Sequence, residues 1–432
     1  MNITPAWRAY LLGSALTVAL IICSRTFLDR GGPYFMALLA LASVLYLLAV
    51  REFFTTPVFP RRVVVIGLML AAVWHIAFLQ MPAGPDDDIH RYVWDGRLQR
   101  LGYNPYVVVP SDPAVKDLHT PETRNLNNPE LPSPYPAGAQ LFFRAVTAIH
   151  ESTFAFKIAF VLCEFAIVFP LLDVLRRNGK GSHLVLAYAW NPLLAIEVAG
   201  SGHIDIVGAL LLVMSAAALA RRWRATAAVV FGLAVAVKFL PIVLLPLYWK
   251  RVRARDLALS ALVVALLYAP FLQHVRIPIG SLGTYVQTFR FNGPIFAALD
   301  RVARPPLVAG FAVLAGVVTA ACLRRTRTEL SLDAFAWPMA ATLLCAPAVF
   351  PWYLLWLLPF LMTASTLLVI VWSVSIIPVY VQWHFRAVGR PWGALPSWVM
   401  LLEYGCVAIA AAILVRCRTS RSPLHCKANA QE

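Results

Sequence analysis

Residues 34–50 read YFMALLALASVLYLLAV, an unbroken apolar run that follows Pro33 and ends before Arg51. A helix needs about 20 apolar residues to cross the roughly 30 Å hydrocarbon core of a bilayer, and this run is close to that length. Comparable runs recur near residues 9–26, 63–81, 153–175, 183–199, 203–220, 256–272, 306–323, 332–347, 367–383 and 397–415. The sequence therefore predicts an all-α polytopic membrane protein, because helices satisfy their own backbone hydrogen bonds in lipid.

The composition supports the same fold class. The 432 residues are 60% hydrophobic and only 13% charged, which is too little polar surface for a soluble globule of this size. The net charge of +16 comes from short clusters between apolar runs and not from one basic domain, so a lipid bilayer is the expected partner and nucleic acid is not. The seven cysteines show neither a disulfide framework nor the spacing of a zinc site.

Two apolar segments differ from the others. Residues 225–249 are interrupted by Lys238 and Pro241, and residues 352–363 are short for a span. We interpret 225–249 as a re-entrant hairpin of two half-helices buried among other helices, because broken helices are tolerated in a membrane only where protein or water covers them. The expected architecture is a single transmembrane domain over residues 1–432 with about 11–13 spans, of roughly 20 residues each.

The basic residues of the short loops predict the orientation through the positive-inside rule. Six clusters are expected to be cytoplasmic: Arg51/Arg61/Arg62, Arg176/Arg177/Lys180, Arg221/Arg222/Arg224, Lys250/Arg251/Arg253/Arg255, Arg324/Arg325/Arg327 and Arg416/Arg418/Arg421/Lys427. If 225–249 re-enters, the clusters on both sides of it share one face and the alternation closes along the chain. The segments 82–150, 273–305 and 384–396 then face outward, and 416–432 forms a basic cytoplasmic tail.

The outer segment 82–150 carries the sequence Pro85-Asp86-Asp87-Asp88 near its start. A proline at the first turn, acidic residues beside it and Gly102 further on are typical of a helix, whose partial apolar stripe predicts that it lies along the membrane surface. Adjacent carboxylates repel one another, which suits one of them to accept a proton in catalysis. Alternatively the acids only complement the positive helix end, or two of them hold Mg or Mn with a substrate phosphate.

The residues that follow, 103–140, are rich in Pro, Asp and Asn and predict a long irregular loop, which in compact proteins is usually a lid or a binding loop. Ionisable residues inside apolar runs are costly and are therefore candidates for function. Six qualify: Lys157, Glu164, Glu197, Asp205, Lys238 and Glu403. Lys238 either meets an anionic lipid phosphate or pairs with Glu197 or Asp205. The aromatic stretch 351–356 either anchors the chain at the interface or stacks an acceptor sugar.

Six stretches together resemble the GT-C class of multi-span glycosyltransferases, particularly bacterial mannosyltransferase-like members that use polyprenyl-phosphate sugars. They are DIHRYVWDG (88–96), GYNPY (102–106), YPAGAQ (135–140), GHID (202–205), KFLP (238–241) and PWYLLW (351–356). The resemblance implies a GT-C-like helix bundle with juxtamembrane helices in its long outer loop. It also implies a multi-pass protein of the bacterial inner membrane whose active site lies on the periplasmic face.

The activity implied by the resemblance is inverting transfer of a hexose, with mannose favoured, from a polyprenyl-phosphate sugar to a glycan or glycolipid acceptor. In such enzymes an acidic residue early in the first large outer loop is the catalytic base, which points to Asp88 with Asp87 as its neighbour. Donor-phosphate binding falls to Lys238, His203, Arg290 and Arg386. Substrate binding falls to Arg91, Tyr92, Asp95, Asn104, Tyr106, Tyr135, Gln140, Asp205, Trp352 and Tyr353. No cofactor is required, although a divalent cation, Mg or Mn, is an alternative, and no metal ligands are assigned.

The sequence departs from its relatives at two positions. Phe350 stands where they often carry a histidine, and Ala137 stands where a second proline is common. Two other functions compete with hexose transfer: a polymerase or ligase of diphosphate-linked glycans, and a lipid-sugar flippase or secondary transporter. A transporter predicts matched broken helices in two repeats. Only one clearly broken helix is evident in the sequence, which favours an enzyme.

Overall fold

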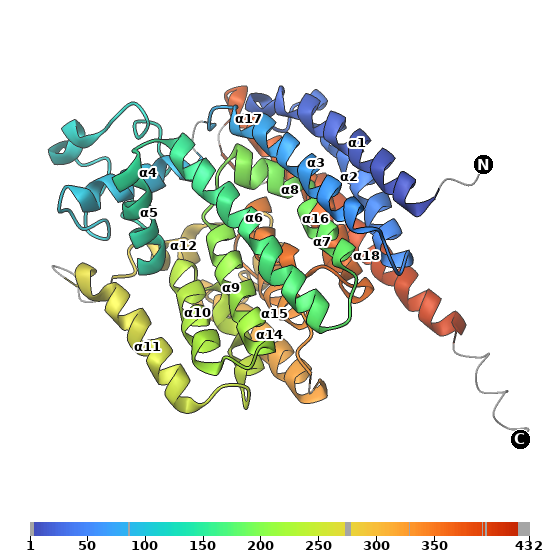
Figure 1. The fold of residues 1–432 in the computed structure, drawn as a ribbon. Coiled ribbons are helices and arrows are strands. Elements are labelled where there is room, and N and C mark those ends of the chain that lie inside the picture. The colour runs from blue at the N-terminus through green and yellow to red at the C-terminus, as the bar shows by residue number, and fades with distance from the viewer. Residues whose placement is uncertain are drawn as a thin grey trace, which may run out of the picture.

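The computed structural model describes residues 4–84, 87–272, 278–327, 329–390, 392–393 and 395–421. Every regular element in these ranges is a helix (Figure 1). Eight helical segments of the described chain are long and apolar enough to cross a membrane: α1 (Pro5–Ser24), α2 (Pro33–Thr55), α3 (Arg61–Leu79), α6 (Thr153–Arg177), Ala254–Phe271 with α11 (Ala254–Tyr268), α14 (Pro305–Thr326), Ala364–Ala387 with α16 (Leu367–Ser375) and α17 (Val381–Ala387), and α18 (Ser397–Arg421). The predicted all-helical, multi-span architecture is confirmed.

These eight segments coincide with eight of the eleven apolar runs. The other three runs form shorter elements: 203–220 forms α9 (Asp205–Ala220) and 332–347 forms α15 (Asp333–Leu344). The run 183–199 is not one continuous helix, because it divides into α7 (Val185–Ala189), α8 (Pro192–Leu194) and the π-helical turn η4 (Ala195–Gly200). Pro192 lacks the N–H that would continue the helix, and the Asn191 side chain caps the new one by accepting from the Leu193 N–H at 3.0 Å.

The two predicted half-helices of 225–249 are present. α10 (Arg224–Val237) is followed by the 3₁₀ helix η5 (Leu240–Tyr248), and the break falls at Lys238 and Phe239. Pro241 lies in the first turn of the second arm, where its missing N–H is not needed. Arg222 and Arg255 line one small cavity, so the chain enters and leaves this hairpin at the same end of the bundle.

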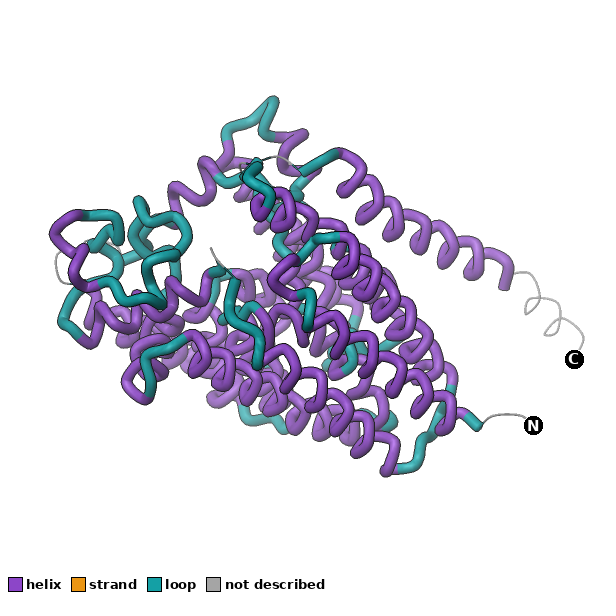
Figure 2. Tube along the Cα trace, turned by 90° about the horizontal axis from the view of Figure 1, so that it is seen from above, coloured by secondary structure: helices purple, strands orange, loops and turns teal. Residues whose placement is uncertain are grey.

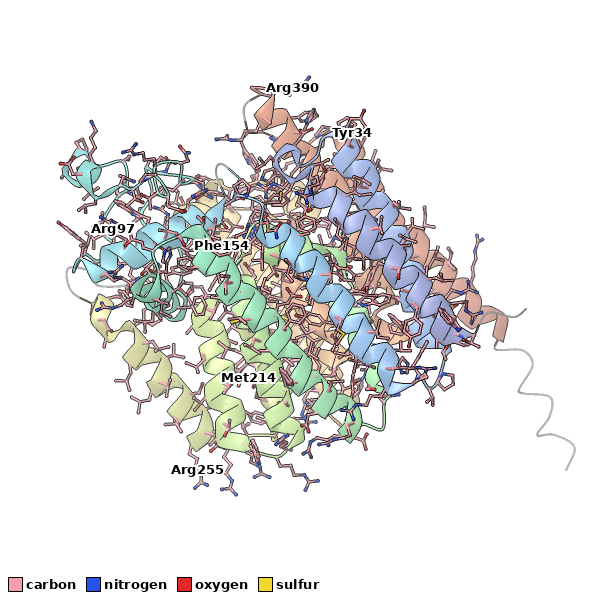
Figure 3. The ribbon with its side chains drawn as sticks, turned by 45° about the horizontal axis from the view of Figure 1, so that its top comes forward. Tyr34, Arg97, Phe154, Met214, Arg255 and Arg390 are labelled. Carbon is pink, nitrogen blue, oxygen red and sulfur yellow. The ribbon has the colours of Figure 1, made fainter. Side chains whose placement is uncertain are left out.

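Three of the six basic clusters, those at 176–180, 221–224 and 250–255, meet at that end. Asp173 near the end of α6 pairs with Arg177 at 2.9 Å and with Arg221 at 3.0 Å. Figure 3 shows Arg255 at this end, whereas Tyr34, at the start of α2, and Arg390 lie at the opposite one. Arg390, in the predicted outward segment 384–396, therefore lies at the end opposite to these three predicted cytoplasmic clusters.

The segment between α3 and α6 holds α4 (Asp88–Arg100), the 3₁₀ turn η2 (Pro113–Leu118) and α5 (Ala137–Ile149), joined by long loops that project from one end of the bundle (Figure 2). The position of α4 along the membrane surface stays a prediction, and its apolar stripe packs against protein. Ile89 and Tyr92 pack into the main core, while Trp94 and Leu98 on another face pack against Val115 from η2. The irregular loop therefore folds back over the face of α4 that carries Trp94 and Leu98.

The remaining described helices are short connections: η1 (Phe27–Asp29), η3 (Ser182–Leu184), η6 (Ala269–Phe271), α12 (Leu282–Thr288), α13 (Pro294–Leu299), η7 (Pro351–Trp356), η8 (Leu358–Phe360), η9 (Ala364–Thr366) and η10 (Ile377–Tyr380). Close packing places η7 against α9. A Cβ atom on Gly208 would lie 1.9 Å from Cη2 of Trp356, so only glycine allows this approach. The contact fixes the aromatic stretch 351–356 beside the start of α9, where the site described next is located.

Candidate functional site

A cavity of about 850 Å³ lies where the loop after α3 meets α9, the α10 break and η7. Its charged and imidazole side chains are Asp87, Asp88, Arg91, His203, Asp205, Lys238, Arg290 and Arg386. Its aromatic side chains are Tyr135, Phe239, Tyr285, Phe289, Phe291, Phe350, Trp352, Tyr353, Trp356, Trp383 and Trp392. A cavity of this size, largely apolar and with a few convergent polar groups, is typical of a small-molecule site.

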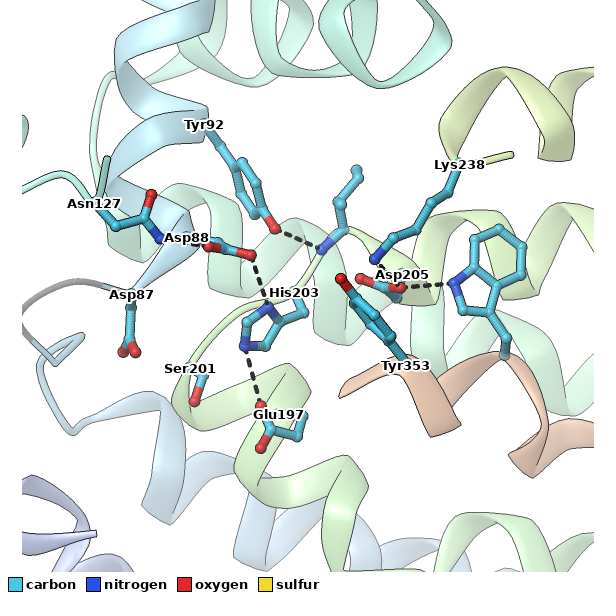
Figure 4. Close-up of polar contacts among 12 residues, drawn as sticks. Asp87, Asp88, Tyr92, Asn127, Glu197, Ser201, His203, Asp205, Lys238 and Tyr353 are labelled. Carbon is cyan, nitrogen blue, oxygen red and sulfur yellow. Dashed lines mark hydrogen bonds and ion pairs between the residues drawn. The ribbon is translucent and has the colours of Figure 1, made fainter. Parts of the chain in front are cut away.

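Asp88 is the first residue of α4 and turns its carboxylate toward the cavity (Figure 4). Its Oδ1 accepts a hydrogen bond from Asn127 Nδ2 at 2.6 Å, and its Oδ2 lies 3.8 Å from His203 Nδ1. The side chain keeps 19% of its surface exposed. Asp88 thus combines access to the cavity with one neutral donor and one imidazole, which is an arrangement suited to a general base.

Asp87 points away from Asp88 and is tied into the protein (Figure 4). Its Oδ1 accepts from Arg30 Nη2 at 2.7 Å and its Oδ2 accepts from the Gly84 N–H at 2.8 Å. Arg30 also donates from Nη1 to Ser201 Oγ at 2.6 Å. The side chains of this ion pair are 6% and 4% exposed, so Asp87 contacts the cavity as a neutralised group. The third acid of the run, Asp86, lies outside the described residues.

Lys238 stands at the break between α10 and η5 and reaches Asp205 at the start of α9. Its Nζ donates to Asp205 Oδ1 at 2.7 Å and lies 4.0 Å from the centre of the Tyr353 ring. Trp356 Nε1 donates to the same oxygen at 2.6 Å. Of the alternatives open for Lys238, pairing with Asp205 is observed, yet its ammonium remains 25% exposed and lines the cavity. A cation held in this way is able to face an anionic substrate group.

The His203 imidazole forms the end of a stack of aromatic rings. It lies on Trp352 with the ring centres 4.0 Å apart and the planes at 9°, and Phe350 covers the other face of Trp352 at 4.5 Å. Phe291 continues the stack beyond Phe350 at 4.5 Å. Because both faces of Trp352 are covered, this residue presents only its edge and is not free to stack a sugar.

Residues 25–252, more than half of the chain, match the family described as alpha-(1->6)-mannopyranosyltransferase, N-terminal domain. The chain belongs to the alpha-(1->6)-mannopyranosyltransferase family. This assignment agrees with the resemblance evident in the sequence. No curated protein matched the chain. Among solved structures, ArnT from Cupriavidus metallidurans bound to undecaprenyl phosphate is similar, with 14% identity and a TM-score of 0.46. The match covers 85% of this chain and 66% of that one.

The other two predicted phosphate-binding residues of this mannopyranosyltransferase-family chain, Arg290 and Arg386, reach the cavity from the C-terminal half of the chain. Arg290 lines it while donating from Nε to Asp300 Oδ2 at 2.8 Å, and Arg386 lines it with an exposed side chain. Arg91 of α4, which was predicted to bind substrate, also lines the cavity and donates from Nη2 to the Asn128 carbonyl at 3.3 Å. The structure thus brings all four predicted phosphate-binding residues to one cavity.

Five predicted substrate-binding residues do not line the cavity: Tyr92, Asp95, Asn104, Tyr106 and Gln140. They hold the loop segment together instead. Gln140 donates from Nε2 to Asp95 Oδ2 at 2.9 Å, and burial raises the pKa of Asp95 above its usual range. Asn104 donates from Nδ2 to the Phe271 carbonyl at 2.9 Å, which ties the loop to the end of the α11 segment. Tyr135, Asp205, Trp352 and Tyr353, in contrast, do line the cavity.

Two residues of the site had no assigned role in the sequence. Arg30 lies in the connection between α1 and α2, on the predicted outer side. An arginine there runs against the positive-inside trend, and this departure is the sequence signal that could have identified it. Asn127 comes from the irregular loop, where neighbouring asparagines and prolines give no pattern that singles it out. Both contact an aspartate far from them in the sequence, so only the fold reveals their partners.

Metal binding needs several convergent ligands. In the part of the chain that the structure describes, no group of three or more His, Cys, Asp or Glu side chains is placed to hold an ion. Of the three acids from which a Mg or Mn pair was considered, Asp87 and Asp88 diverge, since one faces Arg30 and the other Asn127, and Asp86 lies outside the described residues. Metal dependence therefore stays a prediction to be tested with the protein and its substrates.

Proposed function

We propose that this protein transfers a hexose, mannose, from a polyprenyl-phosphate donor to a hydroxyl of a glycan or glycolipid acceptor, with inversion at the anomeric carbon. Family membership supports the sugar and the reaction class. The observation that carries the proposal is that an accessible carboxylate, Asp88, and a cation, Lys238, line one cavity whose surface is largely apolar. A base, a phosphate partner and an apolar wall are the three things that this reaction needs.

The proposed reaction is a single displacement. Asp88 takes the proton of the acceptor hydroxyl as its oxygen forms a bond to the anomeric carbon of the donor sugar. The bond between that carbon and the phosphate oxygen breaks, and polyprenyl phosphate leaves with the electron pair. Lys238 meets the charge that develops on the leaving phosphate, with Arg290 and Arg386 as further donors from the other side of the cavity. Holding both substrates in one cavity supplies the orientation that the reaction needs.

We place the protein in the bacterial inner membrane with the cavity toward the periplasm. Support comes from the eight apolar helical segments among the described residues and from the basic clusters, such as the one around Asp173, at the end opposite to Tyr34. In this orientation the lipid tail of the donor stays within the bilayer while its sugar enters the cavity from the membrane side.

The test is a transfer assay with full-length protein in lipid nanodiscs, labelled polyprenyl-phosphate mannose and a panel of glycan and glycolipid acceptors. Asp88→Asn keeps the shape of the side chain but removes the base, and we expect about 10²–10⁴-fold slower transfer. Asp112→Asn is the matched control, because Asp112 is an exposed carboxylate of the same loop that caps η2 through the Ala114 N–H at 2.9 Å. Asparagine also caps helices well, so this control should keep wild-type activity.

The outcomes separate the alternatives. Full transfer by Asp88→Asn contradicts the role of this carboxylate. Turnover only with diphosphate-linked glycans favours a polymerase or ligase, and movement of lipid-linked sugar across the bilayer without a glycosidic product favours a transporter. Transfer from the mannose donor to an acceptor, lost in Asp88→Asn and kept in Asp112→Asn, supports the proposal.

A further inference from the structure

One buried imidazole lies between two carboxylates at the edge of the cavity. His203 Nε2 is 3.0 Å from Glu197 Oε2, and His203 Nδ1 is 3.8 Å from Asp88 Oδ2 (Figure 4). The side chains of His203 and Glu197 are only 2% and 1% exposed, whereas Asp88 is 19% exposed. Each nitrogen of the ring therefore faces its own carboxylate, and only the Asp88 side of the arrangement is open to substrate.

The backbone fixes the position of the imidazole. The N–H groups of Gly202 and His203 both donate to the Glu197 carbonyl, at 3.1 and 3.0 Å. Gly202 has a φ of +78°, a left-handed conformation that favours glycine, and a Cβ there would lie 2.4 Å from Ile89 Cδ1. The Trp352 ring, stacked at 4.0 Å, prevents the imidazole from tilting. The ring is thus held in one orientation by turn geometry and by packing.

The neighbouring cations already have other partners. Arg30 pairs with Asp87, and Lys238 pairs with Asp205. Lys157 donates to the Met81 carbonyl at 2.6 Å. Among the described residues, the ion pairs of Asp88 and of Glu197 are with His203 alone.

The Tyr380 hydroxyl donates a hydrogen bond to Glu197 Oε1, the carboxylate oxygen that does not face His203. Arg30 adds a more distant positive charge on that side. A buried carboxylate is costly unless it is paired and hydrogen-bonded, and the partners of Glu197 are the imidazole of His203 at 3.0 Å and the Tyr380 hydroxyl. The imidazolium and Glu197 therefore depend on one another.

We propose that Glu197 and His203 act as positioning residues that set the charge of the catalytic base: Glu197 holds His203 as an imidazolium, and the imidazolium holds Asp88 ionised and ready to accept the acceptor proton. This inference rests on the role proposed for Asp88. It assigns to His203 a task besides phosphate binding, since its Nε2 lies 3.0 Å from Glu197 and its Nδ1 faces Asp88 at 3.8 Å. The proton that Asp88 receives leaves to water in the cavity after each transfer.

Electrostatics supports the charge of the imidazole. Complete burial by itself lowers the pKa of His203, but the adjacent Glu197, followed by Asp88 and Asp205, outweighs it and raises this pKa above its usual value. This shift favours the protonated form of the imidazole.

The test is the pH dependence of kcat/KM for hexose transfer in Glu197→Gln. Glutamine keeps the shape but no longer stabilises the imidazolium, so the acidic limb of the profile should move to higher pH by about 1 unit or more. Glu164→Gln is the matched control. Glu164 pairs with His75 Nε2 at 2.8 Å, with side chains 3% and 1% exposed, but neither residue lines the cavity. The control removes the same kind of pair and should leave the limb in place.

Further variants keep the test decisive. His203→Gln removes the cation itself and should give the same displacement, so it replaces Glu197→Gln if that variant does not fold. Glu197→Asp retains the charge and should restore the wild-type profile. No transfer by the wild type refutes the proposed function and is distinct from a failure of this inference. An active Glu197→Gln or His203→Gln protein with an unmoved acidic limb, or an equal displacement in Glu164→Gln, overturns it.

Discussion

Replacing Asp87 by asparagine separates the two described acids at the start of α4. The change keeps the size of the side chain, its place as the residue before the helix and an oxygen for the Gly84 N–H. It removes only the charge that neutralises Arg30. We therefore expect Asp87→Asn to lower stability strongly and Asp88→Asn to lower it little, because Asp88 is 19% exposed and Asp87 is 4% exposed.

The magnitude follows from the geometry of the ion pair. Across the 2.7 Å between Arg30 Nη2 and Asp87 Oδ1, the Coulomb attraction at an effective dielectric constant of about 20 is about 6 kcal/mol. Restored hydration of the remaining charge offsets part of this, and breaking a buried pair from one side typically costs about 3–5 kcal/mol. We expect a loss in this range for Asp87→Asn.

The measurement is unfolding of purified protein in lipid micelles, with transfer activity normalised to the folded fraction. Folded Asp87→Asn should keep activity within about tenfold of wild type, against the 10²–10⁴-fold loss expected for a missing base. The double variant Arg30→Gln with Asp87→Asn should lose less stability than the sum of the two single variants. Wild-type stability with abolished turnover in Asp87→Asn would instead make Asp87 the catalytic carboxylate.

Three other perturbations have definite expected outcomes. Lys238→Gln should reduce kcat for transfer by about 10²–10³-fold, as loss of one oxyanion donor does in other enzymes, and a change in KM alone would contradict a role with the leaving phosphate. Gly208→Ala should destabilise the protein by about 1–3 kcal/mol, measured as a lower unfolding midpoint, because its Cβ would lie 1.9 Å from Cη2 of Trp356; unchanged stability would refute this packing. Treatment with a metal chelator should leave transfer unchanged, and loss of activity restored by Mg or Mn would establish the alternative.

Apolar length predicted most of the fold because a bilayer imposes one requirement on every spanning helix. The eight long segments followed from that requirement alone. Prediction from apolar length failed at 183–199, where protein and not lipid surrounds the chain, since Trp190 and Leu193 are both 1% exposed. In such an environment a proline-broken helix is tolerated, and hydropathy does not distinguish it from a span.

The site was less accessible to the sequence for a related reason. Asp86, Asp87 and Asp88 are chemically identical neighbours, and their intrinsic properties give no ground for choosing among them. The choice depends on Arg30, 57 positions away from Asp87, and on Asn127, 39 positions away from Asp88. Short motifs identified the residues that meet at the cavity, whereas the division of labour among them is set by partners from other parts of the chain.

Differences in burial explain why Asp88, and not one of the other acids near the cavity, is placed to accept a proton. A carboxylate that is fully buried must have a cation of its own, because an unpaired charge in the interior costs several kcal/mol. Asp87, Glu197 and Asp205 have side chains 4%, 1% and 1% exposed, and each lies within 3.0 Å of Arg30, His203 or Lys238. Asp88 lines the cavity, and its Oδ2 lies 3.8 Å from Nδ1 of the same His203 ring that pairs with Glu197. The same physical requirement that buries the other three acids beside their partners leaves Asp88, at 19% exposed, as the carboxylate of the four that a substrate hydroxyl can reach.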